Sequence, residues 1–434
     1  MFGYYLQLAW HSLRRSPVLS ALMVLAIGLG IGASMTMLTV LHVLTANPVP
    51  ARSGQLFRPQ IDPQPMQGYV KGQPPPTEMT WLDAMNLLHA HKGVRQAAMS
   101  GGQVTVVPPQ GVTQAFIARA RYTTSDFFAM FGVPFVDGTG WSAKDDTERA
   151  RVAVITERLA DKLYGTSHAV GRTLRIGKYD FRVAGVIANW NPEPHFYDLS
   201  GGNYTKPEQV FLPFTTATTL GQTTMGSVTC WSNAELSGDL TKTPDCTWVQ
   251  YWVQLRTPAQ VAAYRQYLVN YSEQQKALGR FQRPPNVRLR NVMQWLAFNH
   301  VVPATVQLEG WLAFGFLLVC LINTVALLLV KFLRRGGELS VRRAMGASRR
   351  SIFTQLLIEA VLVGLAGGVI GLLLSLLGLW IVRQQPQQYA MLAHLDGTML
   401  LATFVLAVVA TLLAAVFPAW RACRLPPARL LKTQ

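Results

Sequence analysis

Residues that could do chemistry in this sequence lack the spacing that a catalytic or metal site needs. His89 and His91 stand two positions apart on an expected helix, so their side chains point to different faces. No H-E-x-x-H pair and no G-x-S-x-G segment occurs anywhere in the chain. The sequence therefore predicts no metal centre and no nucleophilic serine, and we expect a non-catalytic protein.

Phosphate-binding loops are also not supported. The run from Gly171 to Lys178 has one residue too many for G-x-x-x-x-G-K-[ST], and Tyr179 stands where a Ser or Thr should bind Mg²⁺. The segment 100–103 reads Ser-Gly-Gly-Gln, as in an ABC ATPase signature, but it continues into a strand-like run and not into a helix. We therefore expect that the chain binds no cofactor and does not hydrolyse ATP by this chemistry.

Composition places much of the chain in a lipid bilayer. Of its 434 residues, 50% are hydrophobic and only 14% are charged, against roughly 25% charged in soluble globular proteins. An α-helix needs about 20 apolar residues to cross a bilayer. Four segments are long enough: Val18 to Leu44, Leu308 to Val330, Ile352 to Val382 and Met399 to Ala419. The first is too long for a signal-peptide core, so we expect it to be retained.

The basic residues predict the orientation of these spans. Arg14 and Arg15 precede the first span, several Lys and Arg lie between the second and third, and others follow the fourth. The short loop at 384–397 contains no Lys or Arg. The positive-inside rule then puts both termini in the cytoplasm and the large region between the first two spans in the periplasm, for a protein of the bacterial inner membrane. This placement explains the net charge of +17 without nucleic acid as a partner.

These signals predict the following order of segments. They are a cytoplasmic interfacial helix (1–16), a first span (17–46), a periplasmic domain (47–305), a second span (306–331), a cytoplasmic coupling loop and helix (332–351), a third span (352–383), a short periplasmic loop (384–397), a fourth span (398–420) and a cytoplasmic tail (421–434).

The periplasmic domain is expected to be of the mixed α+β class. Apolar runs with β-branched residues predict strands at 104–107, 115–120, 152–155, 173–176, 181–187, 210–213, 248–255 and 287–289. Helices are expected at 80–91 and 258–278. Because the domain is large for one core, we expect two lobes. The membrane-proximal lobe would comprise about 48–112 and 247–305, and the inserted lobe about 113–246.

Cys230 and Cys246 flank a polar loop in this expected periplasmic region. An oxidising compartment permits a disulfide between them, and two free thiols are the alternative. Cys320, within the second span, and Cys423, at the cytoplasmic end of the fourth, are expected to stay unpaired.

Glycines recur at helical spacing in two of the expected spans. Small residues four positions apart let two helices approach closely, so these glycines predict helix packing, with a substrate path as the alternative. They are Gly28 and Gly32 in the first span and Gly364, Gly367, Gly368 and Gly371 in the third.

The cytoplasmic segment that follows Arg335 has an ordered pattern. Glu338 and Arg342 stand at i,i+4, where they can form an ion pair, and Gly346 can end a helix in the left-handed conformation. A loop that only fixes topology would need the arginines but not this pattern, which is typical of a docking helix. The expected contacts with a docked partner are Glu338, Leu339, Val341, Arg342, Arg343, Ala344, Met345 and Gly346, with Val341, Ala344 and Met345 as the apolar patch.

Glu359 is the main ionisable residue inside the spans. A charge at such a depth costs up to about 3 kcal/mol unless it reaches the interface or finds a partner. Either an arginine of the docking helix pairs with it, which would make it a brace between that helix and the third span, or it extends to the interface.

Three groups of residues resemble the MacB/FtsX permease family. The docking segment, continued through Phe353 to Ala360, is similar to the family's link between its second and third helices, and Phe417 to Ala422 resembles its closing motif. The runs 126–128, 152–155 and 183–187 look like the MacB-type periplasmic core. The sequence departs from the pattern at Gly336-Gly337, at the start of the second span and at residues 425–427.

The resemblance implies a permease that forms a dimer with an identical or paralogous copy and sits on a pair of separate ABC ATPase subunits, which bind ATP and Mg. It implies mechanotransmission to the periplasm for efflux or secretion, with a periplasmic adaptor and an outer-membrane channel. A lipoprotein-release permease and an FtsX-like regulator of periplasmic cell-wall hydrolases are the alternatives.

Overall fold

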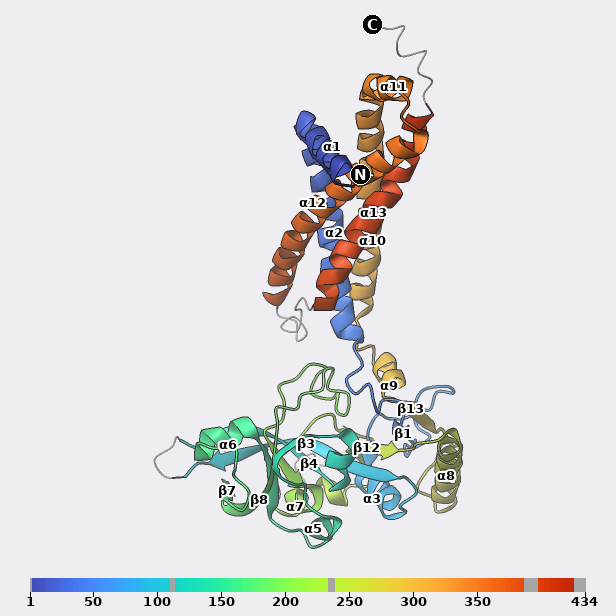
Figure 1. The fold of residues 1–434 in the computed structure, drawn as a ribbon. Helices are drawn as coiled ribbons and strands as arrows, with labels where there is room; N and C mark the ends of the chain where they lie inside the picture. The colour runs from blue at the N-terminus through green and yellow to red at the C-terminus, as the bar shows by residue number, and fades with distance from the viewer. Residues whose placement is uncertain (1, 110–113, 233–238, 386–396, 425–434) are drawn as a thin grey trace. The chain divides into compact units, whose positions relative to one another are not determined.

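The computed structural model describes residues 2–109, 114–232, 239–385 and 397–424, and the chain divides into two compact units (Figure 1). The sheet unit comprises residues 46–301, and the helical unit comprises residues 1–45 and 302–434. Most of the expected loop at 384–397 and of the expected tail at 421–434 lies outside the described residues.

Four helices of the helical unit are long and apolar enough to cross a membrane. They are α2 (Pro17–Thr45), α10 (Ala304–Arg334), α12 (Arg349–Arg383) and α13 (Gly397–Cys423). These helices confirm the four spans predicted from the sequence. The unit also contains α1 (Phe2–Arg15), where the interfacial helix was expected, and the short α11 (Gly336–Ala344) between α10 and α12.

Glycines bring the backbones of α2 and α12 close together. A Cβ on Gly28 would lie 2.7 Å from Cγ2 of Ile370, and one on Gly371 would lie 2.9 Å from Cγ2 of Ile31. Real Cβ atoms essentially never approach a neighbour so closely, so a larger residue at either position would force the helices apart. Gly32 and Gly367 meet Leu374 and Ile27 in the same contact.

A second glycine face of α12 packs against α13. Gly364 faces the side chain of Thr411, and a Cβ on Gly368 would lie 3.1 Å from the Ala407 Cβ. Because Gly364 and Gly368 lie on a different side of α12 from Gly367 and Gly371, this helix has close neighbours on two sides. All six glycines singled out in the sequence therefore lie at helix contacts.

The sheet unit is built on one mixed sheet of 13 strands, of which nine form a continuous path in the order β13-β1-β12-β3-β4-β9-β6-β8-β5. The strands are β1 (Leu56–Gln60), β2 (Met79–Thr80), β3 (Arg95–Val107), β4 (Phe116–Thr123), β5 (Phe135–Gly138), β6 (Val152–Thr156), β7 (Thr173–Ile176), β8 (Tyr179–Ile187), β9 (Val210–Pro213), β10 (Thr224–Met225), β11 (Thr229–Cys230), β12 (Cys246–Gln254) and β13 (Arg288–Asn291). Each strand predicted from the sequence overlaps one of these, and the mixed α+β class is confirmed.

Side chains alternate between the two faces of this sheet, as the period of a strand requires. In β6, Ala153 and Ile155 belong to one apolar core, whereas Val152 and Val154 belong to the other. The first core includes side chains of α3 (Trp81–His89), α6 (Glu157–Tyr164), α7 (Phe214–Thr219) and α8 (Pro258–Ala277). The second includes side chains of α4 (Asp126–Phe131) and α9 (Val292–Phe298). Strands buried on both faces explain the continuous apolar runs in the sequence. The unit also contains α5 (Ala143–Thr147) and the 3-10 turn η1 (Leu240–Lys242).

The expected boundary between the two lobes falls inside this sheet. Strands β13, β1, β12 and β3 come from the segments assigned to the membrane-proximal lobe, and β4, β9, β6, β8 and β5 come from the expected inserted lobe. The two halves join through the antiparallel ladder of β3 and β4, which runs from the pair Met99 and Thr123 to the pair Val106 and Phe116. Both cores contain residues of both halves, so the halves share their apolar interior.

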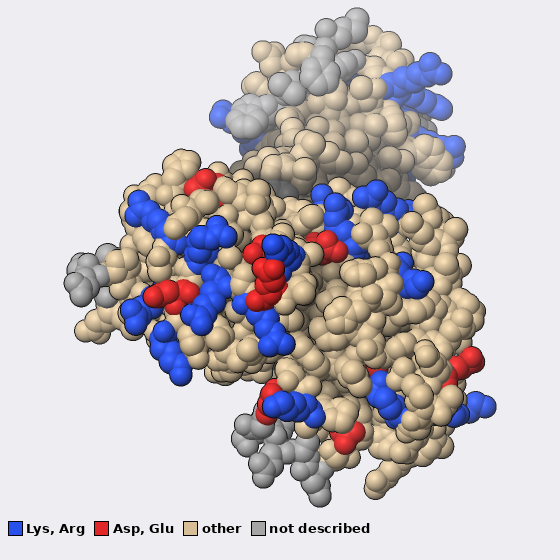
Figure 2. Space-filling model, turned by 90° about the horizontal axis from the view of Figure 1, so that it is seen from below, with Lys and Arg blue, Asp and Glu red and all other residues tan. Residues whose placement is uncertain are grey.

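Charged residues of both signs are mixed on the surface of the sheet unit. Figure 2 shows one face, on which Asp and Glu side chains lie between Lys and Arg side chains. Opposite charges at short spacing cancel at a distance, so this face presents no extended field of one sign.

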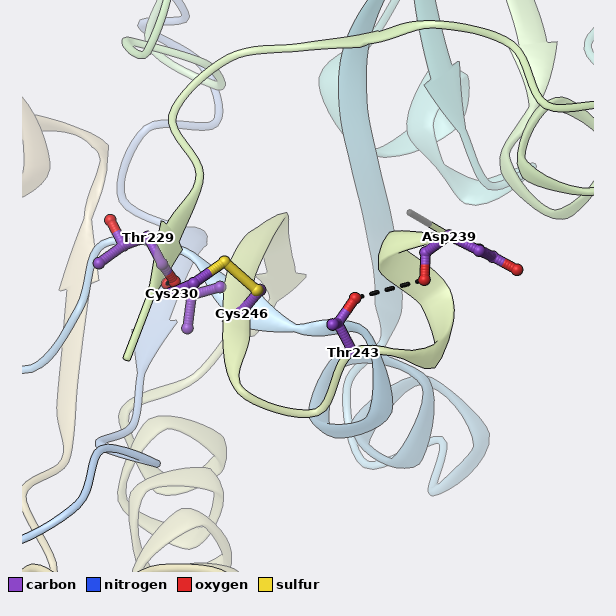
Figure 3. Close-up of a disulfide and its surroundings, with 6 residues drawn as sticks. Thr229, Cys230, Asp239, Thr243 and Cys246 are labelled. Carbon is purple, nitrogen blue, oxygen red and sulfur yellow. Dashed lines mark hydrogen bonds between the residues drawn. A yellow bond between two sulfur atoms is a disulfide. The ribbon is translucent and has the colours of Figure 1, made fainter. Parts of the chain in front are cut away.

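A disulfide joins Cys230 in β11 to Cys246 in β12 (Figure 3). The two residues are directly opposite in an antiparallel ladder, with Cα atoms 4.2 Å apart. Side chains of opposite residues in such a ladder point to the same face, so this register brings the two thiols together. The disulfide closes a 16-residue separation, and the other two cysteines, Cys320 and Cys423, are free and buried.

We expect peptide mapping under non-reducing conditions to recover Cys230 and Cys246 in one linked peptide and Cys320 and Cys423 as alkylated thiols. Replacing both linked cysteines with Ser should destabilise the folded chain by about 3 kcal/mol, because the unfolded chain gains the entropy of an open loop. Recovery of Cys230 as a free thiol from the native protein would contradict the pairing.

Candidate coupling site at the α10 to α12 turn

The short helix α11 begins and ends through local sequence. Arg335 closes α10 and precedes α11 with φ −91° and ψ 7°. At the other end, Gly346 has φ +99°, its N–H donates to the Arg343 carbonyl at 3.1 Å, and the Ala347 N–H donates to the Arg342 carbonyl at 3.0 Å. These two bonds form a Schellman motif, in which the left-handed position favours glycine. Gly346 thus ends the helix as its position in the sequence predicts.

A fully buried carboxylate lies beside this turn. The Glu359 side chain of α12 is 0% exposed, and the Lys331 Nζ of α10 lies 2.7 Å from its Oε1. The Arg335 Nη1 donates to Glu359 Oε2 at 3.0 Å, and the Ser12 hydroxyl of α1 donates to Oε1 at 2.5 Å. One carboxylate therefore joins α1, α10 and α12. These contacts favour the paired alternative for Glu359 over the one in which it extends to the interface.

Glu338 of α11 forms a second, more exposed cluster of ion pairs. Its carboxylate accepts from Arg342 at 3.0 Å and from Arg335 at 3.4 Å, and Arg15 of α1 lies 3.6 Å from it. The pair with Arg342 is the i,i+4 pair predicted from the sequence. Because Arg335 contacts both Glu338 and Glu359, it connects the two clusters.

Two further contacts attach α11 to the ends of the long helices. Arg342 donates to the Gln355 side chain of α12 at 3.2 Å, and Arg343 donates to the Cys423 carbonyl at the end of α13 at 3.4 Å. Leu339 is buried in the apolar core of the helical unit. Polar contacts and the buried Leu339 side chain therefore connect α11 to α1, α12 and α13, while chain continuity connects it to α10.

The opposite side of α11 is apolar and exposed. Met345 is 76% exposed and Val341 is 48% exposed, and Ala344 is exposed next to them. We call Val341, Ala344 and Met345 the α11 patch. A helix that is fixed on one side and presents apolar side chains on the other is suited to contact another protein.

Comparisons with known proteins agree with both units. Residues 20–271 match the model of the MacB-like periplasmic core domain, and residues 310–427 match the model of the FtsX-like permease C-terminal domain. The chain belongs to the MacB/FtsX family of ABC transporter permeases.

Two curated relatives illustrate the level of similarity. The pyoverdine export ATP-binding/permease protein PvdT of Pseudomonas entomophila is 26% identical over 77% of this permease and 45% of its own length. The macrolide export ATP-binding/permease protein MacB of Chlorobium luteolum is 23% identical over 99% of this permease and 60% of its own length. The permease thus spans about half the length of the curated relatives that it matches. Among solved structures, the periplasmic region of MacB from Actinobacillus actinomycetemcomitans aligns with 57% of this permease and 94% of that chain, at 12% identity and a TM-score of 0.35.

The MacB-like periplasmic core domain contains a buried network of charges that the sequence analysis did not identify. Arg121 of β4 donates to Asp198 at 2.7 Å and to Glu208 from its Nε at 3.0 Å. The Tyr197 hydroxyl donates to Glu208 at 2.8 Å, and the His195 Nε2 lies 3.1 Å from the same carboxylate. These contacts attach the segment 195–208 to the sheet.

The network shifts the pKa of its two carboxyl groups downwards. Burial alone raises the pKa of Glu208, but the charges of His195 and Arg121 outweigh it and hold that pKa well below its usual value. The pKa of Asp198 is lowered as well. Burial acts to raise it, but the Arg121 charge and the hydrogen bond from the Ser200 hydroxyl outweigh that effect. Both carboxylates therefore stabilise the fold when ionised, because their folded pKa values lie below those of an unfolded chain.

Among the residues that the structure describes, no group of three or more His, Cys, Asp and Glu could hold a metal ion. Lys331 and Ser12, as partners of Glu359, were not predicted. A lysine at the end of an apolar span is explained by topology alone, and a serine on a surface helix gives no signal of its own.

We expect Glu359→Gln to destabilise the helical unit by about 3–5 kcal/mol, because it leaves the 2% exposed Lys331 side chain without its carboxylate. The measurement is the thermal unfolding of the purified full chain in detergent. Glu309→Gln is the matched control, since Glu309 is exposed on α10 and the change is chemically the same. The double change of Glu359 and Lys331 to Met should recover much of the loss; equal unfolding temperatures for Glu359→Gln and the control would show that the cluster does not hold the helices.

We expect Arg121→Met to loosen the segment 195–208 by about 3–5 kcal/mol at neutral pH, because two buried carboxylates lose their cation. The contribution of these carboxylates is present above their unfolded pKa, near pH 4, and is lost as pH falls through their lower folded values. The difference between variant and wild type should therefore shrink on acidification below about pH 4. Hydrogen exchange of the full chain measures this difference in stability. The control is Arg175→Met, which removes the cation of an exposed ion pair with Asp180. A difference that is independent of pH would contradict this account.

Proposed function

We propose that this chain is the membrane-spanning permease subunit of a MacB-type ABC transporter, and that α11 receives ATP-driven motion from an ATPase dimer that binds ATP and Mg. The observation that carries the proposal is the α11 patch, on a helix whose other side is attached to α1, α12 and α13. Force applied to the patch would reach three other helices through contacts that need no further rearrangement.

Motion at α11 has a direct route into the long helices. Arg335 contacts Glu338 of α11 and Glu359 of α12, and Lys331 of α10 contacts the same Glu359. In a region of low dielectric these pairs are expensive to break, because each separated charge would remain buried. A displacement of α11 would therefore move α10 and α12 with it. We propose Glu359 as the brace of the coupling route.

Orientation follows from the flanking charges. We propose that α1, α11 and both termini lie in the cytoplasm and that the MacB-like core domain lies in the periplasm, since Lys and Arg concentrate at the α11 end of the spans. The protein would then be a multi-pass component of the bacterial inner membrane. The disulfide of Cys230 and Cys246 supports this orientation, because such bonds persist in oxidising compartments.

Export of a substrate is the activity that we propose for the assembly. The relatives that the chain matches are described as pyoverdine and macrolide export proteins, which favours efflux or secretion over lipoprotein release or the regulation of cell-wall hydrolases. We further propose a second permease copy or paralogue, a periplasmic adaptor and an outer-membrane channel as partners. Core-domain movement would then act on the adaptor or substrate outside the membrane, and the substrate would not need a hydrophilic path through the spans.

The proposed contact with the ATPase predicts the effect of Met345→Asp. The change puts a carboxylate into the α11 patch, and burying it without a partner should weaken the complex by more than about 100-fold. The permease should still insert and fold, because the Met345 side chain is exposed and lies outside the four spans. We therefore expect normal membrane levels, loss of the co-purifying ATPase and loss of export.

The control is Leu278→Asp, which makes the same change at an exposed leucine of the sheet unit and should leave ATPase recovery unchanged. Full recovery of the ATPase with Met345→Asp would place the coupling surface elsewhere, with α1 and the basic C-terminal tail as the next segments to examine.

A further inference from the structure

A cavity of about 600 Å³ opens in the helical unit where two bends of the chain meet. One bend joins α1 to α2 and contributes Arg15 and Ser16; the other joins α10 to α11 and contributes Arg334 and Gly337. Val341 of the α11 patch borders this cavity, whereas Ala344 and Met345 do not, and side chains of the two ion-pair clusters form part of its lining.

The lining carries an excess of positive charge. Four cationic side chains line the cavity, those of Arg15, Lys331, Arg334 and Arg335, together with the carboxylate of Glu338. Lys331 and Arg335 also pair with the buried Glu359, so these four cations meet two carboxylates. The Glu338 carboxylate is already shared among several guanidinium groups. Among the described residues Arg334 forms no ion pair, and the Arg15 side chain is 82% exposed. The cavity therefore favours an anion.

Neutral donors complete the lining. The hydroxyl groups of Ser12, Ser16 and Ser340 border the cavity, and Gly337 lies in the first turn of α11. The first N–H groups of a helix have no intrahelical acceptors, and they carry partial positive charge. A Cβ on Gly337 would meet nothing within 4 Å, so the backbone there is open to a ligand. Arginines, hydroxyls and helix N–H groups together are the donors that bind phosphate oxygens in proteins.

The position of the cavity distinguishes a lipid phosphate from a soluble one. Apolar α2 begins at Pro17 and apolar α10 ends at Arg334, so the cavity lies at the boundary of the apolar spans. Farther along α2, exposed apolar side chains follow one face of the helix at helical spacing. They are Val18 (72% exposed), Leu22 (49%), Leu25 (49%) and Leu29 (48%).

We propose that this cavity binds the phosphate headgroup of an anionic phospholipid, with an acyl chain lying along Val18, Leu22, Leu25 and Leu29 of α2. The phosphate would pair with Arg15 and Arg334 and would approach Arg335, which also contacts Glu338 and Glu359. The bound lipid would thus add a negative charge where the ion-pair clusters have surplus cations, and would hold the α1–α2 bend against the α10–α11 bend. This inference depends on the helical unit alone and not on the proposed ATPase contact.

The test is native mass spectrometry of the purified full chain in mixed micelles that contain equal amounts of phosphatidylglycerol and phosphatidylethanolamine. We expect one phosphatidylglycerol to be retained per chain, in preference to the zwitterionic lipid. The double variant Arg15→Gln, Arg334→Gln should bind phosphatidylglycerol about 30-fold more weakly, because each cation near an anionic headgroup contributes a factor of about five to the affinity. The control is Arg350→Gln with Arg421→Gln, which removes two exposed arginines outside the cavity lining and should retain the lipid.

A second variant guards against a folding defect. Ser16→Asp adds a carboxylate to the lining at the position before α2, where Asp is a favourable N-cap residue, so the helix should remain intact while lipid binding is lost. Equal retention of both lipids, or equal loss in the Arg350 and Arg421 control, would overturn the proposal in favour of diffuse attraction. Displacement of the lipid by inorganic phosphate, but not by chloride at equal ionic strength, would overturn it in favour of a soluble anion.

Discussion

The buried carboxylate of Glu359 governs the arrangement of helices at one end of the spans. A charge removed from water must be matched by charges and hydrogen bonds, because an unpaired ion in a low-dielectric region costs several kcal/mol. Lys331 and Arg335 supply the charges, and Ser12 supplies a hydroxyl. Those partners come from different helices, so the requirement to neutralise one side chain also fixes α1, α10 and α12 together. The α11 patch is positioned by the same contacts.

Sequence patterns were sufficient where a single periodicity or a local rule decides the structure. The four spans follow from length and hydropathy, the C-terminal end of α11 follows from Gly346, and eight of the 13 strands in the described residues follow from apolar runs with β-branched residues. The disulfide between Cys230 and Cys246 was predicted from the compartment and the loop composition, but the antiparallel ladder that places the two residues opposite each other was not. In each case the deciding residues lie close together in the chain.

Contacts between distant residues could not be read in this way. The Arg121 network joins β4 to the segment 195–208. Its members carry no local pattern, since an arginine in a strand can equally well lie on a face exposed to solvent. The division into two lobes stays a prediction, and the apolar interior that the two halves share could not be read from the sequence, because strand order within a sheet depends on pairing across long separations. Likewise Glu359 stands out in the sequence as a charge inside a span, but Lys331 reaches it only because α10 and α12 both pack against α2 and α13.

The two glycine faces of α12 have a mechanical consequence. Close backbone approach on one side to α2 and on the other to α13 leaves that helix no room to turn about its own axis, since rotation would drive β-carbons of its flanking residues into a neighbour. Sliding is opposed in the same way, because each glycine must stay opposite the side chain that it accommodates. The glycine contacts therefore oppose rotation and sliding of α12 against α2 and α13. Under the proposed function, this interlocking means that the contacts between α12 and its two neighbours would keep their register while α11 moves.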